Sequence, residues 1–425
     1  MKNGNFLKSL SLRKSLNIDN FYGVICTHEA CTGCMACVNV CAHKAITIIQ
    51  DEEGFERPSI QQNKCVDCGV CQKICPINNP PTLTSPLQVY SGWAKNEDLR
   101  LSSSSGGAFS VLAIPVLQRG GVVFGVTLNK DMQAEHIFVE TETDLYKLRG
   151  SKYVQSRVGD SYKQVKRILL QGREVLFSGT PCQIAGLRNY LHCDYDNLIT
   201  VDLICHGVPS PKVFDDWKVW FKRSFALKDI TKINFRSKKT SWIFFHLAVI
   251  GCTEKDETFE YEGKYYEDAW IRGFLRDYFL RPSCHQCKFT KIERCSDFTI
   301  ADWWGYSGNS AQDKDYERKG VSLLLCNTAK ANSLFVKDVM TSFEFKKRTL
   351  EEAKKTNLSL SRPFARPSTR DAFWKDYHSM DFMDIVKKYM YPERLKLSTR
   401  IKIKYQKNCL RDFILKIVYR LEKYI

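Results

Sequence analysis

Residues 31–41 read CTGCMACVNVC, and residues 65–76 read CVDCGVCQKICP. Both runs carry four cysteines at the spacing C-x2-C-x2-C-x3-C, and the second run ends in proline. In such a run, three closely spaced thiolates bind one [4Fe-4S] cubane, while the fourth cysteine binds the neighbouring cubane. The spacing therefore predicts cluster one on Cys31, Cys34, Cys37 and Cys75, and cluster two on Cys65, Cys68, Cys71 and Cys41.

The residues around the two runs fit the same small module. Residues 45–60, AITIIQDEEGFERPSI, predict a short hairpin with Gly54 in or near its turn. As a whole, residues 26–80 resemble a bacterial-type two-cluster [4Fe-4S] ferredoxin domain, although Ala42 stands where the first run would normally carry proline. A structural zinc site is the alternative, and two complete runs disfavour it because zinc usually takes two CxxC pairs. Cys26 fits neither run and is interpreted as a bystander.

Length and composition set the wider limits. The chain has 425 residues, enough for two to three domains, and its 44% hydrophobic and 26% charged residues argue against global disorder. No apolar run is long enough for a transmembrane helix. Residues 1–25 are assigned as an N-terminal leader, and the first 20 of them lack the apolar core of a signal peptide. We therefore expect a cytoplasmic protein, whose 18 cysteines serve metal or redox chemistry rather than stable disulfides.

From residue 88 onward the sequence alternates between strands, loops and helices. Residues 88–96 predict a strand, a Ser/Gly-rich loop then leads into a helix that ends at Gly120, and residues 122–128 predict a buried strand. Two strand–loop–helix units follow at residues 173–191 and 197–221, which implies an α/β core with a partly parallel sheet. A Ser/Gly-rich loop at a helix N-terminus suits a phosphate or a flavin ring, although many such loops only cap a helix.

Four further cysteines suit a metal site. Cys182 and Cys205 follow two equivalent strands, where α/β cores bind their ligands, and Cys284 and Cys287 form a CxxC pair. Together they are a candidate third four-cysteine cluster, in which Cys295 could replace one member. A free thiol pair and a redox disulfide are the alternatives.

Several strings resemble one known family when they are taken in order. They are SSSSGGAFS, LRGSKYVQS, VLFSGTPCQIAGLRNYL, VDLICHGVPSP, and CHQCKF followed by SDFTIADWWG. With the preceding module they resemble the family of coenzyme F420 hydrogenase/dehydrogenase beta subunits over roughly two-thirds of the chain. The resemblance implies a flavin-binding domain with parts at residues 88–170 and 171–330, bound FAD with a cluster near it, and a two-electron substrate or deazaflavin coenzyme. Coenzyme F420 itself is expected only if the host makes it.

The resemblance also implies flavin-binding residues. By motif position these are Ser105, Gly106, Gly107, Gly150, Ser151, Lys152, Tyr153 and Gln155. Lys152 can pair with a phosphate or stabilise a reduced anionic flavin, and Tyr153 can stack, although an exposed Lys–Tyr pair is also common. His206 is the candidate catalytic residue, as a proton donor or a hydrogen-bond donor to a cluster sulfide, and a purely structural loop histidine is the alternative. Asp302 is expected to cap the turn after its strand.

Residues 331–425 predict a mostly helical, basic tail. Residues 331–357 predict a helix, and residues 361–370, SRPFARPSTR, predict a linker or extended arm because they contain two prolines. From Glu393 to Ile425 there are ten Lys/Arg and three Asp/Glu, so +7 of the net charge of +17 lies here. Such a basic amphipathic helix suits a solvated surface, a partner protein or peripheral contact with an anionic membrane. Its apolar face would hold Ile401, Tyr405, Leu410, Phe413, Ile414, Ile417, Val418 and Leu421.

Two functional hypotheses follow from these features. The first is an iron-sulfur flavoprotein oxidoreductase, in which clusters carry single electrons and FAD exchanges two with a substrate. The second is a non-catalytic, ferredoxin-like electron-transfer subunit that docks on a larger redox enzyme. A structural adaptor, whose clusters only hold the fold, is a third. The expected partner is a redox protein or a small-molecule electron donor or acceptor. Nucleic acid is disfavoured because no recognised binding module accompanies the positive charge.

Overall fold

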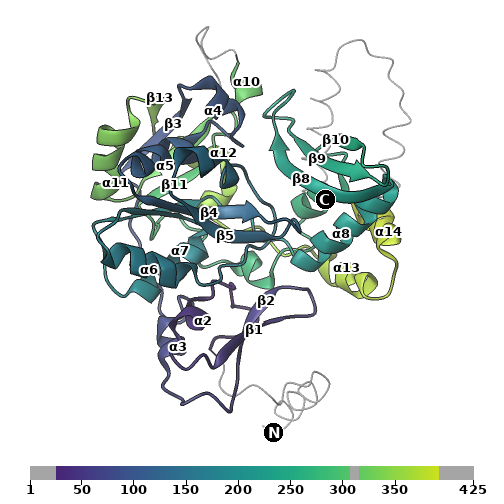
Figure 1. Cartoon of the computed structure of the whole chain (residues 1–425), viewed down its shortest axis with the longest axis horizontal. Coiled ribbons are helices and arrows are strands. Elements are labelled where there is room, and N and C mark those ends of the chain that lie inside the picture. Colours follow the sequence, from purple (N-terminus) through teal and green to yellow (C-terminus); the bar gives the residue numbers. More distant parts are fainter. Residues whose placement is uncertain (1–24, 307–314, 392–425) are drawn as a thin grey trace.

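The computed structural model describes residues 25–306 and 315–391. The predicted leader, apart from its last residue, and the predicted amphipathic helix lie outside the described residues. Within the described ranges there are a two-stranded hairpin, an eight-stranded sheet and a three-stranded sheet. Figure 1 shows the hairpin module below the large sheet, with the three-stranded sheet beside the large sheet.

The N-terminal module contains two short helices and the hairpin. These are α2 (Ala36–Val40), β1 (Ile46–Gln50), β2 (Glu56–Ile60) and α3 (Val70–Ile74). Strands β1 and β2 pair antiparallel, and Gly54 turns the chain between them with a φ of +80°. Its N–H donates to the Asp51 carbonyl at 2.8 Å. The predicted hairpin is therefore confirmed.

The eight-stranded sheet is mixed. Its order is β13 (Phe343–Arg348), β3 (Gln88–Ala94), β12 (Ser322–Cys326), β11 (Phe298–Asp302), β7 (Leu198–Leu203), β6 (Val175–Ser178), β4 (Val122–Leu128) and β5 (Ala134–Val139). The four strands β11, β7, β6 and β4 are parallel to one another, and the other pairings are antiparallel. This confirms the predicted α/β core with a partly parallel sheet.

Helices bury both faces of the parallel strands. In β4, Val122 and Phe124 pack towards α6 (Ser161–Leu170) and α7 (Pro181–Leu191), while Val123 packs towards α5 (Ala108–Gln118). Such alternation is what a strand buried on both faces requires. Cys34 and Met35 join the α6–α7 side of this core, so the N-terminal module packs directly against that helical layer.

The three-stranded sheet forms a second, aromatic-rich core. Its strands are β8 (Leu227–Ser237), β9 (His246–Thr253) and β10 (Thr258–Lys264), all antiparallel. They pack with α8 (Pro211–Ser224), α9 (Ala269–Leu275), α13 (Arg370–Tyr377) and α14 (Phe382–Ile385). The remaining elements are α4 (Glu97–Leu101), η2 (Glu142–Lys147), η3 (Pro282–Gln286), α10 (Tyr316–Lys319), α11 (Ala329–Leu334), η5 (Phe335–Val339), α12 (Leu350–Thr356), η6 (Leu358–Leu360) and η7 (Val386–Met390).

One part of the predicted helical tail is wrong. Residues 331–357 do not form a continuous helix, because β13 interrupts them and pairs with β3 at the edge of the large sheet. Phe343 and Phe345 alternate with charged residues and pack against the core beside Tyr90 and Phe335. The large sheet thus extends past the predicted boundary at residue 330. No helix in the described part of the chain is long and apolar enough to cross a membrane.

Candidate redox site

Four of the predicted ligands meet at one small cavity in the N-terminal module. Cys31, Cys34, Cys37 and Cys75 all line it, and we call them the inner set. The other side chains at its walls are mostly apolar, among them Ile25, Met35, Pro58, Pro76 and Ile77. Cys75, the last cysteine of the second run, thus lies with the first three cysteines of the first run. Four thiols around an apolar cavity are the donor set that a cubane requires.

The other four predicted ligands lie closer to solvent, and we call them the outer set. Cys68 is exposed, while Cys65, Cys71 and Cys41 are half-buried. Cys65 and Cys68 are electrostatic neighbours of Cys71. Cys41, Cys65 and Cys71 pack around the same small apolar core of the module. The inner set is therefore more buried than the outer set.

The arrangement of these thiols is not that of a single-ion site. Within residues 25–306 and 315–391, no three His, Cys, Asp or Glu side chains are arranged to hold one metal ion. The four thiols of a cubane bind four different irons, so the relevant observation is which cysteines share one cavity.

The structure also brings together Cys182, Cys205, Cys284 and Cys287, which we call the third set. Cys182 begins α7 directly after β6, and Cys205 follows the adjacent parallel strand β7, so the two strand ends meet. Each of the four is an electrostatic neighbour of others in the set. Burial raises the pKa of the Cys182 thiol to about 11 and that of Cys284 to about 12. Cys295 instead has Asp202, Arg188 and Arg294 as its main electrostatic neighbours.

Helix α7 connects the inner set with the third set. The Cys182 thiol is hydrogen-bonded to the Thr32 side chain, from the loop between Cys31 and Cys34. One turn further along α7, a Cβ on Gly186 would lie 3.0 Å from the Cys34 sulfur. Contacts along α7 therefore place the inner set next to the third set.

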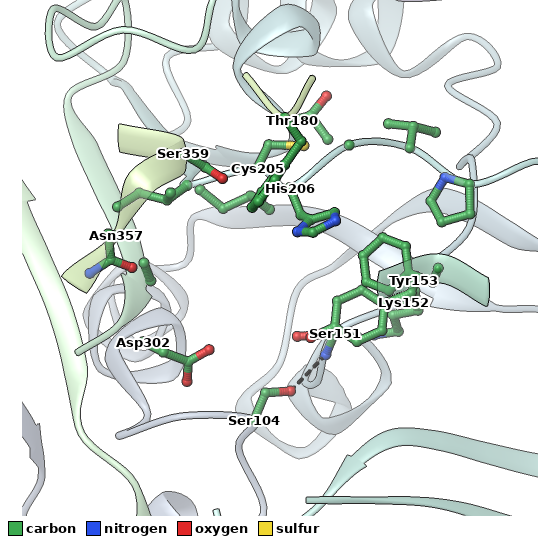
Figure 2. A pocket seen from close by; sticks show the side chains of 18 of the residues that line it. Ser104, Ser151, Lys152, Tyr153, Thr180, Cys205, His206, Asp302, Asn357 and Ser359 are labelled. Carbon is green, nitrogen blue, oxygen red and sulfur yellow. Dashed lines mark hydrogen bonds between the residues drawn. The ribbon is translucent and has the colours of Figure 1, made fainter. Parts of the chain in front are cut away.

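The third set borders a large cavity of about 1820 Å³. The cavity lies at the carboxyl ends of β6, β7 and β11, where α/β sheets bind ligands. Cys182, Cys205, His206 and Asp302 all line it, as do Thr32 and Gly33 from the first cysteine run, residues 31–41, which we call the inner run. Figure 2 shows Cys205 and His206 bordering the same space as Ser104, Ser151 and Asp302. The predicted flavin residues on its walls are Ser105, Gly107, Gly150, Ser151, Lys152, Tyr153 and Gln155.

Gly106 is the predicted flavin residue that does not line the cavity. A Cβ on Gly106 would lie 2.4 Å from the Gly92 carbonyl oxygen and 2.6 Å from the Ser322 nitrogen. Its own carbonyl accepts a hydrogen bond from Ala94 N at 2.7 Å. Gly106 is therefore glycine because the loop approaches β3 and β12 at backbone distance, and it supports the loop from behind.

The two predicted flavin strings face each other across the start of α5. The Ser104 hydroxyl accepts from Ser151 N at 2.8 Å, which Figure 2 shows as a dashed line. Gly107 precedes α5 with a φ of +97° and provides no side-chain cap. Gly150 has a φ of +90°, and a Cβ there would meet only the Ser104 hydroxyl, at 3.9 Å. This helix N-terminus has no cap from Gly107 and only a long hydrogen bond from Ala108 N to the Ser322 hydroxyl, at 3.5 Å. Beside an open glycine surface it fits an anionic group such as a phosphate.

Lys152 and Tyr153 are held by specific partners. Lys152 Nζ donates to the Leu148 carbonyl at 3.1 Å and the Arg149 carbonyl at 2.9 Å, and burial lowers its pKa to about 7. The Tyr153 ring stacks on Phe274 with centroids 4.7 Å apart, and its hydroxyl accepts from Arg236 at 3.1 Å. Both residues are half-buried, so they are not an exposed pair, and their role towards a flavin stays a prediction.

Gln155 and His206 are also anchored at the cavity wall. The Gln155 side-chain oxygen accepts from Glu56 N at 3.0 Å, which ties the wall to the hairpin of the N-terminal module. His206 Nε2 lies 2.6 Å from Asp277 Oδ1. Its ring packs between Phe274 and Phe364, with centroids 4.7 and 4.0 Å away. Nothing in the local sequence links His206 to these partners.

Asp302 does not act as the expected cap. It accepts from Arg236 at 3.0 and 3.3 Å and from Trp242 Nε1 at 2.7 Å, so it anchors a buried guanidinium at the end of β11. The predicted arm, residues 361–370, runs along the cavity, and Arg362, Phe364 and Arg366 are among the residues that line its wall. Sequence reasoning missed both features because their partners are distant along the chain.

Comparisons with known proteins identify the family. The α/β core and cysteine sets define an iron-sulfur protein with a ligand cavity. The family model "Coenzyme F420 hydrogenase/dehydrogenase, beta subunit N-term" matches residues 89–162, and its "C terminus" counterpart matches residues 172–350. A "4Fe-4S dicluster domain" matches residues 30–79. The chain therefore belongs to the family of coenzyme F420 hydrogenase/dehydrogenase beta subunits and carries a 4Fe-4S domain.

The chain is also similar to one individual relative and to one chain of a solved structure. One subunit of the F(420)H(2) dehydrogenase of Methanosarcina mazei is 24% identical over 238 residues, which cover 51% of this chain. The match spans 64% of that relative's length. A chain from the structure of the F420-reducing [NiFe] hydrogenase complex of Methanosarcina barkeri is 16% identical, with a TM-score of 0.39. That alignment covers 75% of this chain and 94% of the other.

Proposed function

We propose that the chain is an iron-sulfur flavoprotein oxidoreductase. It would pass electrons between two [4Fe-4S] clusters, on the inner and outer sets, and a two-electron substrate or deazaflavin coenzyme in the large cavity. Bound FAD supplies the conversion between single-electron and two-electron chemistry. The observation that carries this proposal is one cavity whose walls include the Ser/Gly loop, Cys182 and Cys205 of the third set, and Thr32 of the inner run.

The cavity residues have roles that suit a dinucleotide flavin. The uncapped N-terminus of α5, with Ser105 and Gly107 beside it, would hold phosphate oxygens. Lys152 would add a positive charge at the same wall, because an anion nearby favours its protonated form. The Tyr153–Phe274 stack gives a rigid aromatic surface next to Lys152 in the chain. A cavity of about 1820 Å³ exceeds a usual ligand pocket and can hold two ligands.

The cysteine sets have an order that suits electron transfer. The outer set is the most exposed and would face a redox partner protein, and the inner set lies between it and α7. We further propose a third [4Fe-4S] cluster on Cys182, Cys205, Cys284 and Cys287, because four half-buried thiols meet there. The similarity to a subunit of the Methanosarcina mazei F(420)H(2) dehydrogenase supports a deazaflavin substrate, provided that the host makes one.

His206 is the residue that we propose for proton handling. Its imidazole lines the cavity, and Asp277 fixes its orientation through Nε2. A His–Asp pair can accept a proton and release it to a bound substrate. The surrounding Phe274 and Phe364 rings keep the imidazole in place.

The test is an anaerobic purification of the full chain, with iron, sulfide and flavin measured on one sample. About one FAD and roughly twelve irons would support the flavoprotein with three clusters. Roughly eight irons with FAD would keep the flavoprotein and contradict the third cluster. Full iron without flavin, even after reconstitution with FAD, would contradict the proposal. That result would leave the alternative, a ferredoxin-like electron-transfer subunit that docks on a larger redox enzyme.

A further inference from the structure

A fifth thiol lines the cavity of the inner set. Cys26 stands at the same walls as Cys31, Cys34, Cys37 and Cys75. Its thiol is in hydrogen-bonding contact with the thiols of Cys31 and Cys75. The sequence interpretation of Cys26 as a bystander took no account of this placement, because Cys26 falls outside both spacing motifs.

The backbone holds Cys26 in this position. The Asn78 side chain, from the segment after the second run, donates to the Ile25 carbonyl at 2.7 Å. On the other side, Ala30 N and Cys31 N both donate to the Thr27 carbonyl, at 3.1 and 3.0 Å. Cys26 is thus fixed between a turn and the end of the module.

The second run provides an internal comparison for this position. Lys64 N and Cys65 N donate to the Gln61 carbonyl at 3.1 and 3.0 Å, which repeats the turn that precedes Cys31. Aligned on this turn, Cys26 corresponds to Ile60, a buried apolar residue. Cluster one therefore has a thiol where cluster two has isoleucine.

The chemistry of a fifth thiol at a cubane is constrained. Four thiolates already supply one ligand to each iron, so a fifth keeps its proton and remains a weak S–H donor. A hydrogen bond to a ligand sulfur offsets negative charge, and the reduced cluster carries more of that charge. Such a donor therefore makes the cluster easier to reduce.

We propose that Cys26 is a positioning residue that donates its S–H to the ligand sulfurs of cluster one and raises the reduction potential of that cluster. The inference rests on the proposed iron-sulfur cluster at the inner set. It gives cluster one an S–H donor at the position where cluster two has Ile60, and so helps to set the two potentials apart.

The experiment uses the full chain, purified anaerobically, in four forms. Cys26→Ala removes the donor, Cys26→Ser restores one as a hydroxyl, and Cys193→Ala removes an exposed thiol elsewhere as a control. Iron and sulfide are counted, and each cluster is titrated by redox-poised electron paramagnetic resonance. We expect wild-type iron in all forms and one midpoint moved to more negative potential in Cys26→Ala. That midpoint should return towards wild type in Cys26→Ser and stay unchanged in Cys193→Ala.

Two results would overturn the inference. Unchanged midpoints in Cys26→Ala would leave Cys26 a bystander, and a loss of about four irons would make it a ligand instead. If Cys26→Ala fails to fold, Cys26→Val, which also lacks a donor but fills more of the space, decides by the same two criteria, with one midpoint expected below that of the wild type. A Cys26→Ala/Cys34→Ala double variant tests the proposed cluster separately from the role of Cys26, because neither alanine can bind iron and no spare thiol is left in the cavity. If this double variant keeps all of its iron, the proposed cluster at the inner set fails.

Discussion

The two cysteine runs have the same backbone conformation, but their glycines stand at different positions of it. In the first run the residues with positive φ are Gly33 at +69° and Met35 at +61°. At the corresponding positions of the second run they are Asp67 at +53° and Gly69 at +68°. In both runs, two equivalent positions between the first three cysteines have left-handed backbone conformations. Each run has a glycine at only one of these two positions.

Packing explains the difference between the runs. A Cβ on Gly33 would lie 2.6 Å from Nη2 of Arg281, whereas nothing lies within 4 Å of a Cβ on Gly69. Arg281 is fully buried and donates to the Cys31 and Glu56 carbonyls at 3.2 and 2.7 Å. The inner run is therefore built into the core, while the second cysteine run, residues 65–76, which we call the outer run, meets solvent. One motif thus has two environments, one suited to relaying electrons inward and one to exchanging them with a partner.

The largest expected effect concerns the iron bound by the third set, which lies next to the inner set. If the third set binds a cluster that exchanges electrons with the inner set, Cys284→Ser should remove about four of roughly twelve irons. Cys295→Ser is the matched control, because Cys295 lies apart from the third set, and it should keep all of its iron. Iron and sulfide analysis of anaerobically purified protein checks both. Equal iron in the two variants would show that the third set binds no cluster and that the chain holds only the two clusters of the N-terminal module.

The second prediction tests the packing difference directly. Gly33→Ala should lower the free energy of unfolding by about 3 kcal/mol, because the new Cβ collides with a buried, hydrogen-bonded Arg281 and also strains φ. Gly69→Ala strains φ alone and should cost about 1 kcal/mol. Anaerobic denaturant unfolding of both variants, followed by cluster absorbance, measures the difference. Similar losses would show that the buried environment of the inner run does not distinguish it.

The third prediction concerns the cavity that only the inner run reaches. Burial lowers the pKa of Lys152 to about 7, so the free protein has mostly neutral Lys152 above that pH. Because an anionic flavin favours the protonated amine, binding takes up a proton. FAD affinity should then fall by up to about tenfold per pH unit above 7 and be flat below it.

Lys152→Met should remove this pH dependence, whereas Lys355→Met, at an exposed lysine on the same wall, should retain it. Fluorescence titration of FAD at several pH values provides the measurement. The same shift makes the unfolded chain bind more protons than the folded chain from pH 7 to about 10, so stability of the flavin-free protein should rise across that window. An affinity that is independent of pH in the wild type would place the flavin phosphates away from Lys152.

The sequence could predict those features that depend on residues close together in the chain. Ligand spacing in the two runs and the strand–loop–helix units are set by near neighbours, and the structure shows the hairpin and the parallel strands as expected. Strand β13 was missed because Phe343 and Phe345 give a short alternation among lysines typical of a helix surface. The Arg236–Asp302 pair joins residues 66 apart, and Cys26 shares a cavity with Cys75, so only the folded chain brings them together. Site assignments that rest on such long-range contacts need the structure.

The smallest expected effect concerns the positions with positive φ at which each run lacks a glycine. Asp67 has a φ of +53°, a conformation that costs an aspartate less than most residues but more than glycine. Asp67→Gly should therefore stabilise the outer run by about 0.5 kcal/mol, since relief of strain slightly exceeds the added freedom of the unfolded chain. Met35→Gly is the matched change in the inner run, and it should destabilise the protein because Met35 is 2% exposed and packs in the core. Anaerobic unfolding should thus give opposite signs for two substitutions that relieve the same kind of backbone strain. If both variants lose stability, backbone strain is too small to matter in either run, and burial alone separates the two environments.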